Sequence, residues 1–199
     1  RMDRHSRNVV LTICVAVMAM QASVANAYTP GHPEVQAMAN RGLAYIQANF
    51  GKSHYDKTLG GHAVCAMAAF THTGNENHPL VKAAIKEIRD GVAKGFETGE
   101  HAHYSLGLAL LLLGSLETRL YPQEVTALLD AIYKNQRSNG TWTYPNEQIG
   151  DTSQSQYACL GMWMAHRQGI QVKIPAVANA TNWFLRTQAP DGGFGYRPK

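Results

Sequence analysis

Cysteine is scarce in this chain of 199 residues, which contains only three. Cys14 lies in an amino-terminal segment with its own signature, so only Cys65 and Cys159 belong to the remainder. Small exported domains that depend on disulfides carry many more cysteines than this. Both remaining cysteines lie in apolar stretches, where a buried free thiol is the usual state. We therefore expect a fold that is held together by packing.

Charged residues are also few, at 16% of the chain, and the formal net charge is only +4. Removal of residues 1–27 would lower this charge by two, because the segment holds three Arg and one Asp. So small an excess argues against a polyanionic partner, and we expect no nucleic acid. The chain also lacks a Gly-x-Ser-x-Gly elbow and a Gly-rich phosphate-binding loop.

No apolar run approaches the about 20 residues that a membrane-spanning helix needs. The longest candidate, residues 9–20, follows three arginines and precedes the small residues 25–27. This order is typical of a secretory signal peptide that is cleaved near Ala27. We expect an exported protein, periplasmic or secreted, that starts near Tyr28 and has no membrane span. An uncleaved anchor remains the alternative for this segment.

A repeat becomes visible when the prolines are aligned. Four X-Pro pairs stand directly before stretches with helical spacing of apolar residues, at His32-Pro33, His78-Pro79, Tyr121-Pro122 and Ile174-Pro175. Proline is favoured in the first turn of a helix, where its missing N–H is not needed. The four prolines predict helix starts that are 46, 43 and 53 residues apart.

Two kinds of helix are expected to alternate along this repeat. Helices after the prolines have one apolar face, formed by residues three and four positions apart. The expected faces are Val35, Met38, Ala39, Ile46 and Phe50; Val81, Ile85, Ile88 and Val92; Val125, Leu128, Leu129 and Ile132; and Val177, Ala180, Phe184 and Leu185. Helices over residues 62–73, 103–113 and 152–166 are apolar nearly all round and rich in small residues. They are therefore expected to be inner helices that pack closely.

Alternation of half-polar and apolar helices predicts two concentric layers. The fold class is all-α, and the expected architecture is a partial α/α toroid of about three and a half helical hairpins over residues 28–199. An α-solenoid of stacked hairpins is the alternative, since periodicity does not show whether the superhelix closes.

Two turns carry a resemblance to a known family. QRSNGTW runs from Gln136 to Trp142, and QAPDGGFGY runs from Gln188 to Tyr196. Both resemble the Gln-Gly-aromatic motif of the prenyltransferase and squalene-cyclase repeat superfamily. The segments LGGHAVCAMAAF and GDTSQSQYACLGMW are similar to inner-helix openings in exported bacterial proteins with such repeats. The resemblance covers roughly residues 33–196, although the second hairpin lacks the motif.

The resemblance implies an α/α toroid in which the motif glutamine closes a helix and the aromatic ring packs on the next repeat. It also implies a chain that is incomplete at its carboxyl end, since a fourth inner helix should begin near Lys199. The superfamily's cyclases use an Asp-x-Asp-Asp acid, its diphosphate lyases an Asp-Asp-x-x-Asp motif and its zinc enzymes an Asp-x-Cys pair. This sequence contains none of the three.

Polar residues at the beginnings of the inner helices should converge at one end of a toroid. Helix amino termini also favour anionic or polar ligands. Asp151 and His62 are the candidate catalytic residues, and the candidate ligand-binding residues are His101, His103, Thr152, Gln154 and Trp142. The simpler interpretation makes Asp151 and Thr152 helix caps, the histidines solvated loop residues and Trp142 a packing residue.

Metal and cofactor sites are not expected. Glu100, His101, His103 and His62 could form part of a zinc shell, but their spacing alone is only suggestive. The leading functional hypothesis is an exported, noncatalytic binding or scaffold protein with a concave apolar surface for a small molecule or a protein partner. The alternative is a cyclase-like or prenyltransferase-like enzyme acting on an isoprenoid or another apolar substrate.

Overall fold

The computed structural model describes residues 29–96 and 99–197. The predicted signal peptide, residues 1–27, lies outside these ranges. The chain divides into two compact units, residues 1–42 and 43–199, whose boundary falls within the first described helix, α2 (Pro33–Asn49). The described part of the first unit consists of a turn and the beginning of α2.

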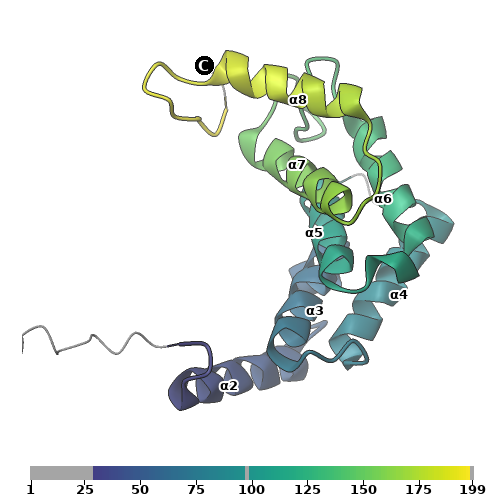
Figure 1. Cartoon of the computed structure of the whole chain (residues 1–199), viewed down its shortest axis with the longest axis vertical. Helices are drawn as coiled ribbons and strands as arrows, with labels where there is room; N and C mark the ends of the chain where they lie inside the picture. Colours follow the sequence, from purple (N-terminus) through teal and green to yellow (C-terminus); the bar gives the residue numbers. More distant parts are fainter. Residues whose placement is uncertain (1–28, 97–98, 198–199) are drawn as a thin grey trace, which may run out of the picture. The chain divides into compact units, whose positions relative to one another are not determined.

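The second unit continues from α2 with six further α-helices, labelled in Figure 1. They are α3 (Leu59–Thr73), α4 (Pro79–Lys94), α5 (Ala102–Ser115), α6 (Pro122–Asn135), α7 (Thr152–Arg167) and α8 (Ile174–Thr187). Short 3₁₀ turns occur at Tyr55–Lys57 and Thr118–Leu120. The described residues contain helices and loops without a strand, so the all-α prediction is confirmed. None of these helices is long and apolar enough to cross a membrane.

The predicted helix starts are confirmed at all four prolines. Pro33 and Pro79 are the first residues of α2 and α4, Pro122 is the first of α6, and Pro175 is the second of α8. Two inner helices begin at polar caps: the side chain of Thr58 accepts from Gly61 N before α3, and that of Asp151 accepts from Gln154 N before α7. Such caps bond backbone N–H groups that a helix start leaves without partners.

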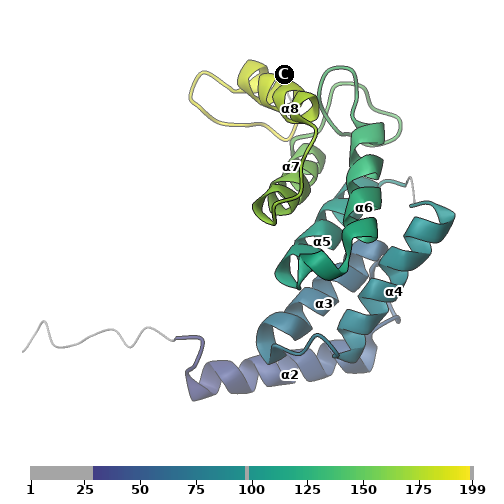
Figure 2. The ribbon, with the colours of Figure 1, turned by 45° about the vertical axis from the view of Figure 1, so that its right-hand side comes forward.

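Helices α3, α5 and α7 follow one another in contact, with α4 packed on α3 and α6 on α5 (Figures 1 and 2). Leu106, Leu110, Leu112 and Leu113 of α5 are buried, as expected for an inner helix. Gly107 lets α5 approach α7 closely, because a side chain there would overlap the backbone oxygen of Tyr157. Small residues therefore set the spacing of the inner helices, as the sequence predicts.

The helices that follow the prolines differ in how much of their predicted apolar face is buried. Val81, Ile85 and Ile88 of α4 are buried, as are all four predicted residues of α6. In α8 the prediction is confirmed for Ala180 but wrong for the rest of the face: Ala176 and Trp183 are buried in place of Val177 and Phe184, and Leu185 is 68% exposed. The larger indole takes the core position and turns the neighbouring apolar face outward. No residue of α2 is buried.

The two motif turns have the same geometry. Gln136 Nε2 donates to Gly140 O at 3.0 Å, and Gln188 Nε2 donates to Gly192 O at 2.8 Å. Gly140 and Gly192 both have positive φ, at 97° and 86°. Gln136 Nε2 also donates to Ala176 O at 2.8 Å and so ties its turn to α8. The glutamine thus holds the chain after its helix, in agreement with the predicted role.

Candidate functional site

The amino-terminal turns of α5 and α7 bring three of the candidate residues together. His103 Nδ1 lies 2.9 Å from Gln154 Oε1, and Gln154 Nε2 donates to Glu100 O at 2.8 Å. Gln154 N in turn donates to Asp151 Oδ1 at 2.8 Å. His103, Gln154 and Asp151 are all buried. They therefore form one connected polar network between two inner helices.

The network sets the tautomer of His103. The amide of Gln154 must present its NH₂ group to the carbonyl oxygen of Glu100, so its oxygen faces the imidazole. An amide oxygen only accepts, so His103 Nδ1 carries the hydrogen and donates it. Burial lowers the pKa of His103, the bond to Gln154 raises it, and the nearby charge of Arg137 lowers it; the net direction is downward from 6.5. At neutral pH, Nε2 is consequently a bare acceptor.

Asp151 has no exposed surface, and its two carboxylate oxygens differ in their surroundings. Oδ1 caps α7 by accepting from Gln154 N, and it also accepts from Ser153 Oγ at 2.6 Å. Oδ2 is buried and has no hydrogen-bond partner. The residue therefore acts first as a helix cap, with one carboxylate oxygen left unused.

A chain of hydroxyl groups extends from this cap to the end of the described chain. Tyr104 OH lies 2.5 Å from Ser153 Oγ and 3.3 Å from Tyr144 OH, which lies 2.9 Å from Tyr196 OH. The bonds to its two tyrosine neighbours are the main cause that raises the pKa of Tyr144. Thr152 is bound beside this chain, with its hydroxyl donating to Gly195 O at 2.7 Å. The hydroxyl chain thus ties helix α5 and two loops, those of Tyr144 and Tyr196, to the amino terminus of α7.

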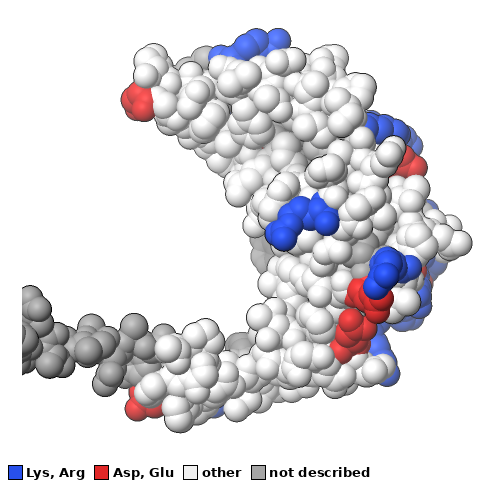
Figure 3. All heavy atoms as spheres, viewed as in Figure 1, with Lys and Arg blue, Asp and Glu red and all other residues white. Residues whose placement is uncertain are grey.

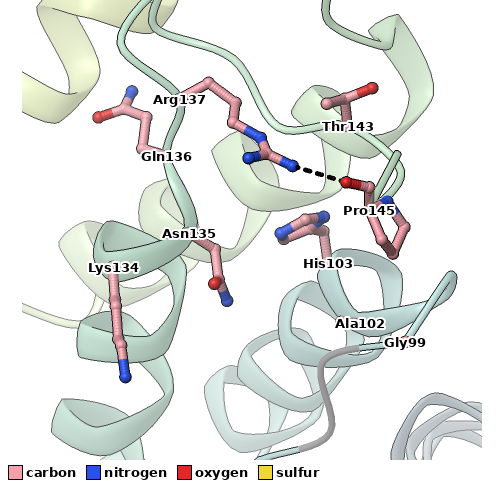
Figure 4. A pocket seen from close by; sticks show the side chains of 9 residues that line it. All are labelled: Gly99, Ala102, His103, Lys134, Asn135, Gln136, Arg137, Thr143 and Pro145. Atoms are coloured by element: carbon pink, nitrogen blue, oxygen red, sulfur yellow. Dashed lines mark hydrogen bonds between the residues drawn. The ribbon is translucent and has the colours of Figure 1, made fainter. Parts of the chain in front are cut away.

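A pocket of about 270 Å³ opens beside His103, and we call it the His103 pocket (Figure 4). Its lining consists of Gly99, Ala102, His103, Lys134, Asn135, Gln136, Arg137, Thr143 and Pro145. Figure 4 shows the side chains of His103 and Arg137 directed into the same space, whereas Lys134 points away. The guanidinium is held by one bond, from Nη2 to Pro145 O at 3.3 Å. Its described lining residues include no acidic side chain.

The other candidate residues lie elsewhere. His62 packs edge-on against Phe50, with a ring separation of 4.9 Å, and its buried Nδ1 has no partner. His101 is exposed and contacts the rings of Tyr55 and Tyr104. Trp142 is fully buried and donates from Nε1 to Ile132 O at 2.8 Å, which makes it a packing residue in this structure. Within the described ranges, no hydrogen bond or ring contact joins His62 to Asp151 or His103.

A second hollow, which we call the α7–α8 cleft, has a volume of about 300 Å³ and an almost wholly apolar lining. It is lined by Cys159, Met162, Trp163 and His166 of α7, Val172 of the linker, and Val177, Thr181 and Phe184 of α8. Trp163 is 49% exposed and Val177 36%. Burial raises the pKa of Cys159 to about 11, so this thiol is uncharged. Figure 3 shows a face of the molecule on which uncharged side chains prevail.

Sequence reasoning missed Arg137, Tyr104, Ser153 and the cleft residues. A signal for Arg137 was present, because it directly follows the motif glutamine that holds this turn. The cleft has no such local signal, since it forms between residues of two helices.

No group of three or more His, Cys, Asp or Glu side chains in the described ranges is placed to hold a metal ion. Comparison of the chain with protein-family models, curated proteins and solved structures finds no match in any of the three.

Proposed function

We propose that this protein is a noncatalytic binding module that holds an apolar small molecule in the α7–α8 cleft. One observation carries the proposal: an almost wholly apolar hollow of about 300 Å³ stands open to solvent between two helices. This size lies at the lower end of the range for small-molecule sites, which are typically apolar with a few polar groups. His166, Thr181 and Cys159 supply those groups here.

The exposed aromatic surface in the cleft supports the same function. Leaving half of the Trp163 side chain in water forgoes part of the about 1.5–3 kcal/mol that full burial of a large apolar side chain contributes. An apolar ligand that covers Trp163 and Val177 would recover that free energy. Single exposed apolar residues are common, but these line one hollow.

The same proposal includes export of the protein and a repeat architecture of the toroid type. The amino-terminal signature supports export and cleavage near Ala27. The matching Gln136 and Gln188 turns support the likeness to the prenyltransferase and squalene-cyclase repeat superfamily and, with it, an α/α toroid. We propose that the α7–α8 cleft belongs to the inner surface of such an arrangement.

Binding of 1-decanol, monitored by tryptophan fluorescence, tests the function. Trp142 and Trp183 are buried, so a ligand in the cleft should alter mainly the emission of Trp163. We expect saturable binding to the wild-type chain. A Val177→Asp variant should bind at least about tenfold more weakly, because it places a charge in the apolar lining.

Leu185→Asp is the matched control, because Leu185 lies on the same helix, is 68% exposed and is not part of the cleft lining. It should keep the affinity of the wild-type chain. Absence of saturable binding, or equal weakening by both substitutions, would contradict the proposal. Selective binding of an apolar helical peptide in place of decanol would assign the cleft to a protein partner.

An isoprenoid-processing enzyme with Asp151 and His62 is the second candidate. The unpartnered Oδ2 of Asp151 favours it, since a carboxylate oxygen without a partner is available for proton transfer. The full burial of Asp151 and the separate surroundings of His62 favour the binding module. Turnover of an isoprenoid substrate that is lost in Asp151→Asn would support the enzyme.

A further inference from the structure

The His103 pocket has a donor set that matches an anion. Arg137 forms no ion pair with any described residue, and the residues described in the lining include no Asp or Glu to neutralise it. A guanidinium group is well suited to bind a carboxylate or a phosphate, because its planar N–H donors fit two oxygens at once. Within the described residues, the guanidinium of Arg137 donates only to the carbonyl oxygen of Pro145, which leaves most of its N–H donors without a protein partner.

His103 supplies the second independent feature. The residue is buried, with an exposed fraction of 9%, and it lines the pocket beside Arg137. Gln154 holds Nδ1, while Nε2 has no hydrogen-bond partner in the described part of the chain. The imidazole is therefore fixed in orientation, and one ring nitrogen stays free for a ligand or a proton. Asn135 adds a side-chain amide to the lining.

The position of the pocket on α5 adds to these features. Gly99 and Ala102 lie at the amino end of α5, a helix of 14 residues. Backbone N–H groups and the positive end of the helix dipole favour negative charge at this place. Two sources of positive potential, the guanidinium of Arg137 and the amino end of α5, therefore meet beside the imidazole in one hollow of about 270 Å³.

We propose that the His103 pocket binds a small oxyanion, such as a carboxylate or phosphate group, and that His103 takes up a proton at Nε2 when the anion binds. The protonated imidazole then donates to one oxygen of the anion, and Arg137 donates to another. This site is separate from the α7–α8 cleft, so either proposal can fail without the other.

The charged and titratable groups around His103 determine the pH dependence. Among the described residues these groups are Glu100 and His101 before α5, Tyr104 on α5, Lys134 near the end of α6, Arg137 and Glu147 in the loop between α6 and α7, and Asp151 at the cap of α7. Asp151 is engaged in the cap of α7, and Glu147 is paired with Arg197. Arg137 is thus the charge that directly opposes protonation of His103.

A bound anion reverses this balance. Without an anion, burial and Arg137 hold the pKa of His103 below its ordinary value of 6.5. With an anion in the pocket, the charge of Arg137 is compensated and the protonated ring gains a partner, so the pKa rises. By linkage, the anion must bind more tightly to the protonated form, and its affinity increases as pH falls.

Titration with sulfate tests this proposal, because sulfate keeps its charge across the relevant pH range. Binding is measured by calorimetry at pH 7.5 and 5.5, and the His103 pKa is measured by NMR with and without sulfate. We expect about tenfold tighter binding at the lower pH and a rise of about one unit in the pKa, which are linked quantities. Sulfate binding without a pH dependence would overturn the proton uptake.

The substitution Arg137→Gln should weaken sulfate binding at least about tenfold, since it removes charge-assisted hydrogen bonds. Arg186→Gln is the matched control: Arg186 also donates a single bond of 3.3 Å to a carbonyl oxygen, that of Asn139, and does not line the pocket. Equal effects of the two substitutions, or no sulfate binding at either pH, would overturn the proposal. His103→Gln should retain weak binding and lose its pH dependence.

A parallel titration with acetate shows whether the pocket prefers a carboxylate or a phosphate-like group. Stronger binding of acetate than of sulfate assigns the site to a carboxylate, and the reverse order assigns it to a phosphate-like group. Arg137→Gln should weaken both, since each ligand uses the same guanidinium.

Discussion

His103 combines three conditions that rarely coincide in one side chain. It is buried, it has a fixed tautomer through Gln154, and it lies beside the unneutralised guanidinium of Arg137. Each of these conditions influences where the proton resides. The residue therefore links the stability of the fold to pH as well as forming part of the proposed anion site.

The stability of the folded chain should fall as the pH is lowered through about 6.5. The pKa of His103 is lowered in the folded state, so the unfolded state binds the proton more tightly. Between the unfolded pKa and the lower folded pKa, unfolding takes up a proton and acid favours it. Urea denaturation in a sulfate-free buffer at pH 7.5 and 5.5 measures this loss.

His103→Gln should reduce the difference in unfolding free energy between the two pH values, even though it also lowers stability overall. The exposed His101 offers a control, and His101→Gln should leave the difference unchanged. A pH dependence in His103→Gln that equals that of the wild-type chain would show that other groups are responsible.

At the scale of single elements, the motif turns carry the most specific constraints. Gly140 has a φ of 97°, and a side chain there would overlap the backbone oxygen of Asn179 in α8. Both the conformation and the close approach require glycine. The turn and α8 are thus held together by contacts that a single methyl group would break.

Gly140→Ala should lower the free energy of unfolding by more than about 2 kcal/mol, because backbone strain adds to the overlap with α8. Gly74→Ala is the control, since Gly74 also has a positive φ, of 64°, but has open space around it. That change should cost only about 1 kcal/mol. Equal losses in the two variants, measured by urea denaturation, would show that packing against Asn179 contributes nothing.

Helix starts and core faces were largely predictable, because they depend on local chemistry. Proline in the first turn of α4 and spacing of three and four residues in α6 follow from backbone geometry alone. The buried face of α8 was not predictable, since the competition between Trp183 and Phe184 for the core depends on the neighbouring helices.

In the candidate site too, residues at helix starts were predictable from local sequence, whereas residues placed by tertiary contacts were not. His103, Gln154 and Asp151 could be proposed together, since each stands at the first turn of an inner helix. Tyr144 and Tyr196 could not be added, because their contacts depend on loops that have no periodic pattern. Arg137 enters the pocket only through the turn that Gln136 holds against Ala176.

At the scale of the whole molecule, stability is distributed unevenly along the chain. Helix α2 contains no buried residue, whereas α5 contains nine. Burial of apolar surface is the main source of resistance to local unfolding, so α2 should open far more easily than α5. A helix stabilised mainly by its own hydrogen bonds is only marginally stable in water at this length.

Brief digestion with trypsin should therefore cut first at Arg41 within α2 and leave a fragment that retains α3 to α8. Mass spectrometry identifies the first cleavage site. Lys86, in the middle of α4, is an exposed comparison site in a helix with five buried residues and should be cut later. First cleavage at Lys86 would contradict this order.

The contact of Gly107 with Tyr157 determines what kind of length variation the chain can accept. The two helices approach so closely here that any side chain at position 107 would overlap the backbone of α7. One extra residue inserted between His103 and Gly107 would swing the imidazole by about 100° around the helix axis and carry it away from Gln154. All residues of the polar network would still be present in the sequence, but the hydrogen bond between His103 and Gln154 would be lost. Insertions and deletions between related chains should accordingly collect in the loops and spare these few turns.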